Sequence, residues 1–582
     1  MEKPTSLSAH RVQKIFRAWP ILLVFFLALL TRLYWIHEKE YMYIDDPTSV
    51  SLAYNLPGWG KKTFEAGHIL TGKELRQQCY IDDRGGLEGL WDDLAALHHD
   101  NRDGSHASLY YMALRCALTG VDTPSTDMLI RRSCGLNLVF FGLSFLSMTL
   151  LLHMLFPGKT MLTTFCLLLA YMNPVSVSNV LQAREYLMAE WLFVLWAYWC
   201  LRAAARIHNQ QTLWAPGTFT GGLAISAALL SCGYFNALFF GFTLLCLAVY
   251  SCRQHAYKDL GFYPVLGIAS LLVCVLLYEG FFNFLHDARA TEVADKMQGG
   301  DWLSNLRLTV IGLGYITALR ILTPVWGVAI ILYLVTLLVR KPKQPFHSHR
   351  LPGAWLFVCA MAWAVVVMWM ANWKATRYIS PSVPLCLVAV AYYLALGLQR
   401  VPKVLAGIFV AAFIAYAWCE RPMEYVNRTS DREWPSHAKR ILLYGPDHEE
   451  KNTLLLITHF IGDKQEIAIV EHTTDILRDG PFLFAFRLLA DIHSALGSGG
   501  CFQLLQGQLD GGVAVARCRV DGVELAQALV QIDRHALVHP KGAHAAGGMT
   551  HIGLHLIFPL PRSYSVMAQT RAGRPVAPSM RG

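Results

Sequence analysis

Charged side chains are scarce in this sequence. They make up 16% of its 582 residues, whereas soluble domains carry about 25%. Hydrophobic residues account for 54%, and the mean hydropathy is +0.35. This composition argues against the several soluble domains that a chain of this length would otherwise form. It predicts an α-helical polytopic membrane protein.

Two other signals are missing. The 14 cysteines show no C-x-x-C spacing, and most lie in apolar runs, so we expect small buried residues rather than metal ligands. Cys501 and Cys518 lie in a polar C-terminal part. They form a disulfide if that part is exported, or else they stay buried thiols. No small-x-small cleavage site follows the first apolar run, which predicts a retained helix rather than a signal peptide.

The apolar runs are long enough to cross a membrane. "WPILLVFFLALLTRLYWI" (19–36) approaches the length of about 20 residues that a hydrocarbon core of roughly 30 Å requires. Similar runs recur through the first 420 residues. We expect about eleven membrane helices, at 18–36, 135–156, 160–175, 186–204, 217–233, 235–251, 262–284, 317–339, 353–371, 382–398 and 404–420. The stretch 305–322 is either part of a span or an interfacial helix.

The basic residues set the expected orientation. The net charge of +9 is explained by Lys and Arg in cytoplasmic loops, so we do not expect nucleic acid as a partner. All these residues fall on one side if residues 1–17 are a cytoplasmic tail of a plasma (inner) membrane protein: Lys3, Arg11, Lys14, Arg17, Lys159, Arg202, Arg206, Arg253, Lys258, Arg340, Lys341, Lys343, Arg350, Arg400 and Lys403. An odd number of spans then places residues 421–582 outside.

The chain divides into a membrane domain, residues 18–420, and an extracytoplasmic C-terminal domain, residues 421–582. The membrane domain includes a long first extracytoplasmic loop, 37–134, with 15 acidic and 8 basic side chains between 37 and 130. Within it, "LEGLWDDLAALHH" (87–99) predicts a helix with Leu87, Trp91 and Leu97 on its apolar face and Asp92 and Asp93 largely off it. That helix lies either in the membrane interface or on the protein's own core.

The C-terminal part has the alternation of short strands. "RILLYGP", "TLLLITHFIG" and "QEIAIVEH" predict a small exported α/β domain over about 435–535. "CFQLLQGQLDGGVAVARC" (501–518) predicts two strands joined at Asp-Gly-Gly. The composition of the tail beyond predicts partial disorder.

Two adjacent carboxylates, Asp45 and Asp46, follow the first apolar run. A carboxylate at the membrane surface serves as a general base or as an oxygen ligand for a divalent cation. Asp-Asp-Pro is equally good turn chemistry. The spacing leaves all three interpretations open. His106, in "DGSHASLYYMAL", is likewise either a ligand or proton carrier, or a packing and capping residue.

Three cations are expected on the same side as these acids. Arg184 lies at the outer end of the fourth span, where it either binds an anion or pairs with a neighbouring glutamate. Lys374 and Arg377, followed by Tyr378, depart from the positive-inside trend. They predict an anion site or contacts with lipid headgroups. A cavity that joins these cations to the acid pair suits a lipid phosphate.

These motifs and their order resemble the GT-C superfamily of polyprenyl-phosphate-sugar-dependent glycosyltransferases. The nearest patterns are those of the lipid A aminoarabinose transferases and the protein O-mannosyltransferases. The resemblance covers roughly residues 18–420, and no family motif occurs beyond 420. It rests on "YIDDPTSVSLAYNL", "HASLYYMAL", "RRSCGLNLVFFGL", "AREY" and "RYISPSVP".

The resemblance implies a catalytic base in the first outer loop, which maps onto Asp45. Members of the family commonly have Glu at the next position, where this chain has Asp46, so either acid is a candidate. In members that use a divalent metal such as Mg, Mn or Zn, Asp46 and His106 would be the ligands. The family often has proline directly after that histidine, whereas Ala107 and Ser108 follow it here. The residues at donor-phosphate positions are Arg184, Lys374, Arg377 and Tyr378.

The implied function is inverting transfer of one sugar from a polyprenyl-phosphate donor to a hydroxyl of lipid A, a cell-envelope glycan or a protein. The alternative is a lipid-linked sugar flippase or an O-antigen polymerase. A flippase needs charges along a path through the membrane, whereas the charges expected here gather at one face. A third interpretation, a non-catalytic anchor for the C-terminal domain, would need neither so many spans nor a cationic outer loop.

Overall fold

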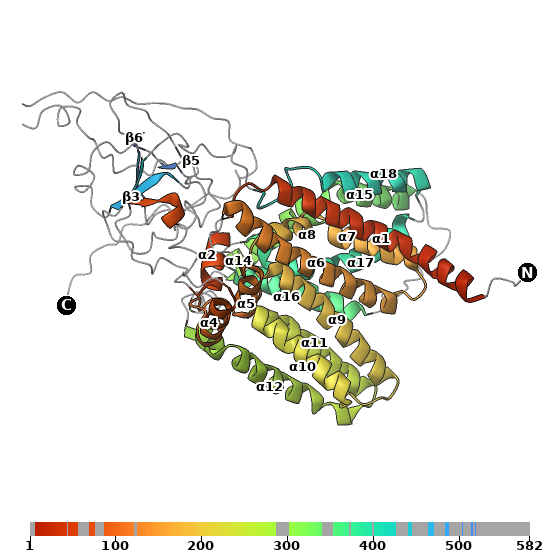
Figure 1. The fold of residues 1–582 in the computed structure, drawn as a ribbon. Coiled ribbons are helices and arrows are strands. Elements are labelled where there is room, and N and C mark those ends of the chain that lie inside the picture. The colour runs from red at the N-terminus through yellow and green to blue at the C-terminus, as the bar shows by residue number, and fades with distance from the viewer. Residues whose placement is uncertain are drawn as a thin grey trace, which may run out of the picture.

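The computed structural model describes residues 6–43, 45–55, 69–75, 86–120, 125–286, 291, 302–339, 353–371, 374–398, 401–426 and 464–465, and six short strands between 440 and 519. These residues are mostly helical, as the composition predicts. Figure 1 shows a bundle of long helices, with the strands gathered beyond one end of it. The chain is a multi-pass membrane protein by the length and hydropathy of its helices.

Six apolar helical segments are long enough to cross a membrane on their own. The first is the residue 19–38 part of α1 (Ser6–Glu38), which begins within the tail predicted for residues 1–17. The others contain α6 (Thr126–Leu155), α9 (Tyr186–His208), α11 (Asn236–Arg253), η2 with α12 (Tyr257–Asp259 and Phe262–Leu277), and η6 with α17 (Ser380–Ser382 and Val383–Leu398).

The remaining apolar helices are bent or short. Two bent pairs bring the number of candidate spans to as many as eight: α7 (Thr160–Met172) with α8 and η1 (Pro174–Ser178 and Asn179–Leu181), and α14 and η4 (Trp302–Ile316 and Thr317–Ile321) with α15 (Thr323–Val339). Shorter apolar helices are α10 (Pro216–Cys232), α16 (Ala354–Met370) and α18 (Lys403–Tyr416). The 98° bend after η4 gives the ambiguous stretch 305–322 a direction different from that of α15.

The break between α7 and α8 has a clear local cause. Pro174 has no N–H to continue the helix, and the Asn173 side chain accepts from Ser176 N at 3.0 Å as an N-cap. The buried Arg32 of α1 donates to the carbonyl oxygens of Tyr171 and Ser176 at 3.0 and 3.1 Å. A backbone that leaves helical geometry inside a bundle needs such hydrogen-bond partners. After this break the chain continues through η1 to residues 182–184.

Helices of the first loop lie at one end of the bundle, which we call the loop end: α2 (Asp46–Ala53), α4 (Gly86–His99) and α5 (Leu109–Ala117). Helix α4 is present as predicted, and Leu87 and Trp91 are 69% and 68% exposed. Asp93 departs from the prediction because it is buried. Its carboxylate pairs with Arg115 Nε of α5 at 2.6 Å, which fixes α4 against α5.

Two sheets are described. The larger has the order β1-β3-β2-β4-β6, and β1 (Ile69–Thr71) comes from the first loop. It pairs antiparallel with β3 (Glu466–Val470), while β2 (Arg440–Tyr444), β4 (Phe484–Arg487) and β6 (Ala514–Val515) continue the sheet in parallel. Strands β5 (Gln503–Leu504) and β7 (Cys518–Arg519) form a separate antiparallel pair. The alternatives for Cys501 and Cys518, the strand predicted at 453–462 and the tail after 535 lie outside the described residues and side chains.

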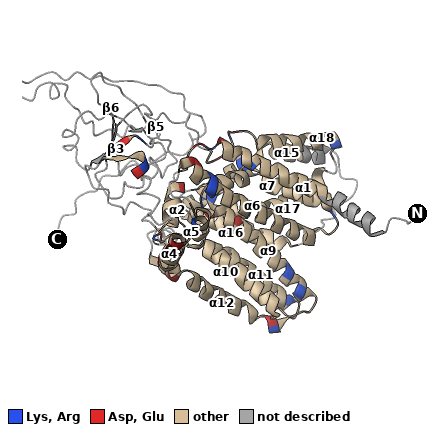
Figure 2. Ribbon diagram, viewed as in Figure 1, with Lys and Arg blue, Asp and Glu red and all other residues tan. Residues whose placement is uncertain are grey.

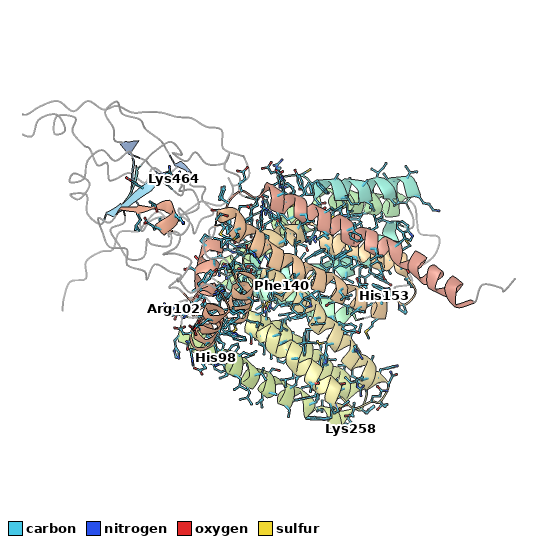
Figure 3. All side chains as sticks on the ribbon, viewed as in Figure 1. His98, Arg102, Phe140, His153, Lys258 and Lys464 are labelled. Carbon is cyan, nitrogen blue, oxygen red and sulfur yellow. The ribbon has the colours of Figure 1, made fainter. Side chains whose placement is uncertain are left out.

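The two ends of the bundle carry different charges. Figure 2 shows Asp and Glu gathered near α4 and α5 at the loop end, and Lys and Arg near the far ends of α9 to α11. Figure 3 places Lys258 at the far end, opposite His98 and Arg102. Cations are present at the loop end as well, where Lys39, Arg115 and Arg377 pair with carboxylates.

Candidate active site

Three segments converge at the loop end. They are the turn between α1 and α2, the turn at 182–184 between η1 and α9, and the segment with η5 (Thr376–Tyr378) that precedes η6. The 182–184 turn is held by Asn137 of α6, whose side chain donates to the carbonyls of Val180 and Gln182 at 3.2 and 2.7 Å. The 182–184 turn is thereby fixed to the bundle before any charged side chain is considered.

Asp46 is a structural carboxylate. Its Oδ2 pairs with Lys39 Nζ at 3.1 Å and accepts from Tyr43 N at 2.8 Å, while its Oδ1 accepts from Ala183 N at 2.8 Å. The Asp46 and Lys39 side chains are 2% and 1% exposed. Because both oxygens are engaged and water is excluded, Asp46 joins the α1–α2 turn to the 182–184 turn and leaves no oxygen for a substrate.

Asp45 faces the other way. Its Oδ2 pairs with Arg377 Nη1 at 2.7 Å and accepts from Gln182 Nε2 at 3.4 Å. Its Oδ1 lies 3.8 Å from Arg184 Nη2. The side chain is 17% exposed. Asp45 is therefore an accessible carboxylate between two guanidinium groups, and of the two acids it is the one that can meet a substrate.

Arg377 is surrounded by aromatic rings. Its guanidinium carbon lies 5.3 Å from the Tyr378 ring centroid and 5.9 Å from that of Tyr43, within cation–π range. Burial alone would lower the pKa of Arg377, but the Asp45 carboxylate reverses this and raises it. Burial raises the pKa of Tyr43 to about 12, despite the opposing charge of Arg377. The buried Nε of Arg377 has no hydrogen-bond partner among the described residues.

Arg184 is tied to the predicted histidine by a chain of hydrogen bonds. Its Nη1 donates to the Tyr111 hydroxyl at 3.1 Å, and that hydroxyl donates to Asp103 Oδ2 at 2.8 Å. His106 Nδ1 lies 2.8 Å from the same Oδ2, and His106 Nε2 lies 3.8 Å from a Glu185 oxygen. The structure therefore brings His106 and Arg184 into one network with Asp45.

The charges of this network stabilise one another. Burial alone would lower the pKa of His106, but the Asp103 and Glu185 carboxylates raise it above its ordinary value. Burial alone would raise the pKa of Asp103, yet the charges of His106 and Arg184 hold it well below its usual range. The two carboxylates thus favour the charged form of His106, while the Arg184 charge opposes it.

Lys374 has a different position. Its ammonium donates to the carbonyls of Met368, Trp369 and Ala371 at 2.6, 3.2 and 2.9 Å. These are the last carbonyls of α16, which have no partner within the helix. Lys374 is therefore held as the cap of α16, a helix-end role that favours a cation.

The segment after α18 packs against the site, a contact that no sequence motif predicts. The carbonyl of Tyr425 accepts from Lys39 Nζ at 3.0 Å, and its ring lies 4.7 Å from the Tyr43 ring in an edge-to-face arrangement. The buried Glu424 carboxylate contacts Arg320 of η4 and accepts from Thr376 at 3.4 Å. Burial raises the pKa of Glu424.

A divalent cation does not fit the residues named for it. Asp46 has both oxygens engaged, and each ring nitrogen of His106 faces a carboxylate. Within the described part of the chain, no group of three or more His, Cys, Asp or Glu side chains could hold a metal ion.

The sequence patterns did not predict the contacts of four residues around the site: Lys39, Asp103, Tyr111 and Gln182. Lys39 carried a signal, because it is a cation directly after a membrane span on the side expected to be acidic. Gln182 and Tyr111 carried none beyond their nearness to Arg184 and His106 in the sequence. No protein-family model and no curated protein matches this chain.

Proposed function

We propose that this protein is an inverting glycosyltransferase that moves a single sugar from a polyprenyl-phosphate donor to an acceptor hydroxyl at the outer membrane face. The observation that carries the proposal is the accessible Asp45 carboxylate held between Arg377 and Arg184. Transfer from a lipid phosphate needs a base for the acceptor and cations for the departing phosphate. This cluster supplies both within one small site.

The donor phosphate would bind Arg377 and Arg184. A guanidinium presents paired N–H groups that match phosphate oxygens, and the aromatic faces of Tyr43 and Tyr378 support Arg377 from its sides. We leave Lys374 out of this site because its ammonium is held by the carbonyls at the end of α16.

In the proposed reaction the acceptor oxygen attacks the anomeric carbon on the face opposite the phosphate. The acceptor O–H bond breaks, and Asp45 takes the proton. The new C–O bond forms as the bond from the anomeric carbon to the phosphate oxygen breaks, which inverts the anomeric centre. Polyprenyl phosphate leaves with the bonding pair, and the two arginines stabilise its charge.

We also propose the full topology expected from the sequence, a GT-C-like domain with eleven spans, the N-terminus inside the plasma membrane and residues 421–582 outside as an α/β domain. Apolar helices, counting the bent pairs and the short helices, overlap the eleven predicted positions and so support this proposal. The opposite placement of Lys258 and the acidic helices supports one inside end and one outside end.

The flippase alternative is less well supported. Arg32 of α1 and Glu190 of α9 are completely buried. Arg32 donates to the carbonyls around the α7–α8 break, and Glu190 contacts Ser144 and Asn179. They line no accessible path, as a transport route for a charged lipid would require.

The test is transfer or hydrolysis of a radiolabelled polyprenyl-phosphate sugar by the reconstituted protein. Asp45→Asn should lower turnover by about 10²–10⁴-fold, as expected for loss of a general base. The matched control is Asp127→Asn, which removes an exposed carboxylate paired with Arg131 on α6. Wild-type turnover in Asp45→Asn would sink the catalytic assignment.

A second measurement addresses donor binding. Arg377→Ala should weaken donor binding by more than tenfold, because it removes a partly buried cation from the phosphate. Arg131→Ala is the control, since that arginine is 75% exposed in its own ion pair. An unchanged donor KM in Arg377→Ala would remove that residue from the phosphate site.

A further inference from the structure

The guanidinium of Arg184 contacts two groups, the Asp45 carboxylate and the Tyr111 hydroxyl. Its Nη2 faces Asp45 Oδ1 at 3.8 Å, the looser contact, whereas its Nη1 donates to the Tyr111 hydroxyl at 3.1 Å. The proposed donor phosphate would take the place of Asp45 beside Nη2. The other end of the guanidinium must then be held by something that does not leave.

Tyr111 is suited to hold it. The hydroxyl has one proton, which it donates to Asp103 Oδ2 at 2.8 Å, so its lone pairs remain for Arg184. Tyr111, Asp103 and Arg184 are 1%, 5% and 4% exposed. Hydrogen bonds to charged groups in such a poorly hydrated place are stronger than neutral ones, and their orientation is fixed.

Asp103 is itself fixed from several directions. Its Oδ1 accepts from Ser105 N at 3.1 Å, its own N–H donates to Asn101 Oδ1 at 2.9 Å, and His106 Nδ1 lies 2.8 Å from its Oδ2. The loop before α5 thus presents a preorganised carboxylate to the Tyr111 hydroxyl. None of these contacts involves Asp45, so they persist when Asp45 moves.

We infer that Tyr111 and Asp103 are positioning residues for Arg184, holding its guanidinium in place while the donor phosphate replaces Asp45 at the other end. The inference rests on the proposed function, because it takes Arg184 as a ligand of the donor phosphate. Tyr111 touches neither donor nor acceptor in this scheme and acts through Arg184 alone.

The experiment measures the Kd for a polyprenyl monophosphate in detergent, and kcat and donor KM for transfer, in Tyr111→Phe, Arg184→Ala and the double variant. Tyr111→Phe should raise Kd and donor KM by roughly tenfold and change kcat by less than about threefold. In the Arg184→Ala background, Tyr111→Phe should have no further effect, because its partner is gone. The control is Tyr263→Phe. This variant loses the buried hydroxyl of Tyr263 on α12, which is hydrogen-bonded to Ser251 at 2.6 Å, and it should bind polyprenyl monophosphate with the wild-type Kd.

The outcomes distinguish failure of the positioning role from failure of the proposed phosphate site. Two outcomes overturn the positioning role and leave the proposed function standing. In one, Tyr111→Phe raises Kd equally in the wild-type and Arg184→Ala backgrounds. In the other, Arg184→Ala raises Kd but Tyr111→Phe leaves it unchanged. An unchanged Kd in Arg184→Ala overturns the phosphate site and this inference together. If Tyr111→Phe is not recovered folded, Asp103→Asn repeats the comparison, with the same dependence on Arg184 expected.

Discussion

Replacement of Asp45 by Asn has two effects of opposite sign if the site works as proposed. The carboxylate pairs with Arg377 at 2.7 Å and faces Arg184 at 3.8 Å. It therefore occupies the position that a donor phosphate needs. Asn has the same shape and no charge, so it removes the proposed base and, with it, the anion that competes with phosphate. We expect turnover to collapse while the affinity for polyprenyl phosphate rises.

The size of the second effect follows from the geometry. A hydrogen bond to a charged group contributes about 1.5–3 kcal/mol, and Asp45 and Arg377 are each 17% exposed, so solvent screens the pair only in part. The Asn side chain retains some of that contact. An affinity gain of about 1.4 kcal/mol, or roughly tenfold in Kd, is the expected result.

The assay is binding of a polyprenyl monophosphate to wild type and Asp45→Asn in the same detergent, with inorganic phosphate as a second probe that lacks the lipid. Tighter binding with lost turnover supports exchange of Asp45 for phosphate. Weaker or unchanged binding of both probes would refute it, because Asp45 would then not compete for the arginines. Asp127→Asn again serves as the control for a general change in charge.

Three further predictions concern residues around the site. Lys39→Met should destabilise the protein by about 3–5 kcal/mol, because it leaves the Asp46 carboxylate buried without its counter-charge; thermal unfolding in detergent measures this, and a wild-type melting temperature contradicts it. The Asp103 and Glu185 carboxylates raise the pKa of His106. The contribution of His106 to stability is therefore full below about pH 6.5 and is lost as pH rises through the raised pKa. His106→Gln should remove this pH-dependent contribution from the pH–Tm curve, and a curve identical to that of wild type would contradict the prediction. Lys374→Ala should lower Tm but leave donor KM within about twofold, as expected for a residue that caps α16; a large rise in KM would return Lys374 to the phosphate site.

The sequence was sufficient to locate the helices. Apolar helices overlap the predicted runs, including the short third one, where α7 stops at Met172, but only six of the described helical segments, or up to eight with the bent pairs, are long enough to cross a membrane. Long apolar segments leave water whatever they later pack against, so their positions can be found without knowing the fold. Helix α4 was also located, but the burial of Asp93 was not predicted, because its partner Arg115 lies on a different helix.

The choice between neighbouring polar residues needed the tertiary structure. Asp45 and Asp46 are adjacent, yet Asp46 turns inward to Lys39 and the Ala183 N–H, while Asp45 faces Arg377. Nothing local distinguishes two consecutive aspartates before a proline.

By itself, then, the sequence determined where the long apolar helices lie and which charged residues are near their ends, because hydrophobicity sums over consecutive residues. The tertiary structure decided which of those charges meet. Arg377 reaches Asp45 across 332 positions of the chain, and Ala183 reaches Asp46 across 137. Contacts of that separation depend on how the helices pack and where α7 breaks, and no local pattern encodes them.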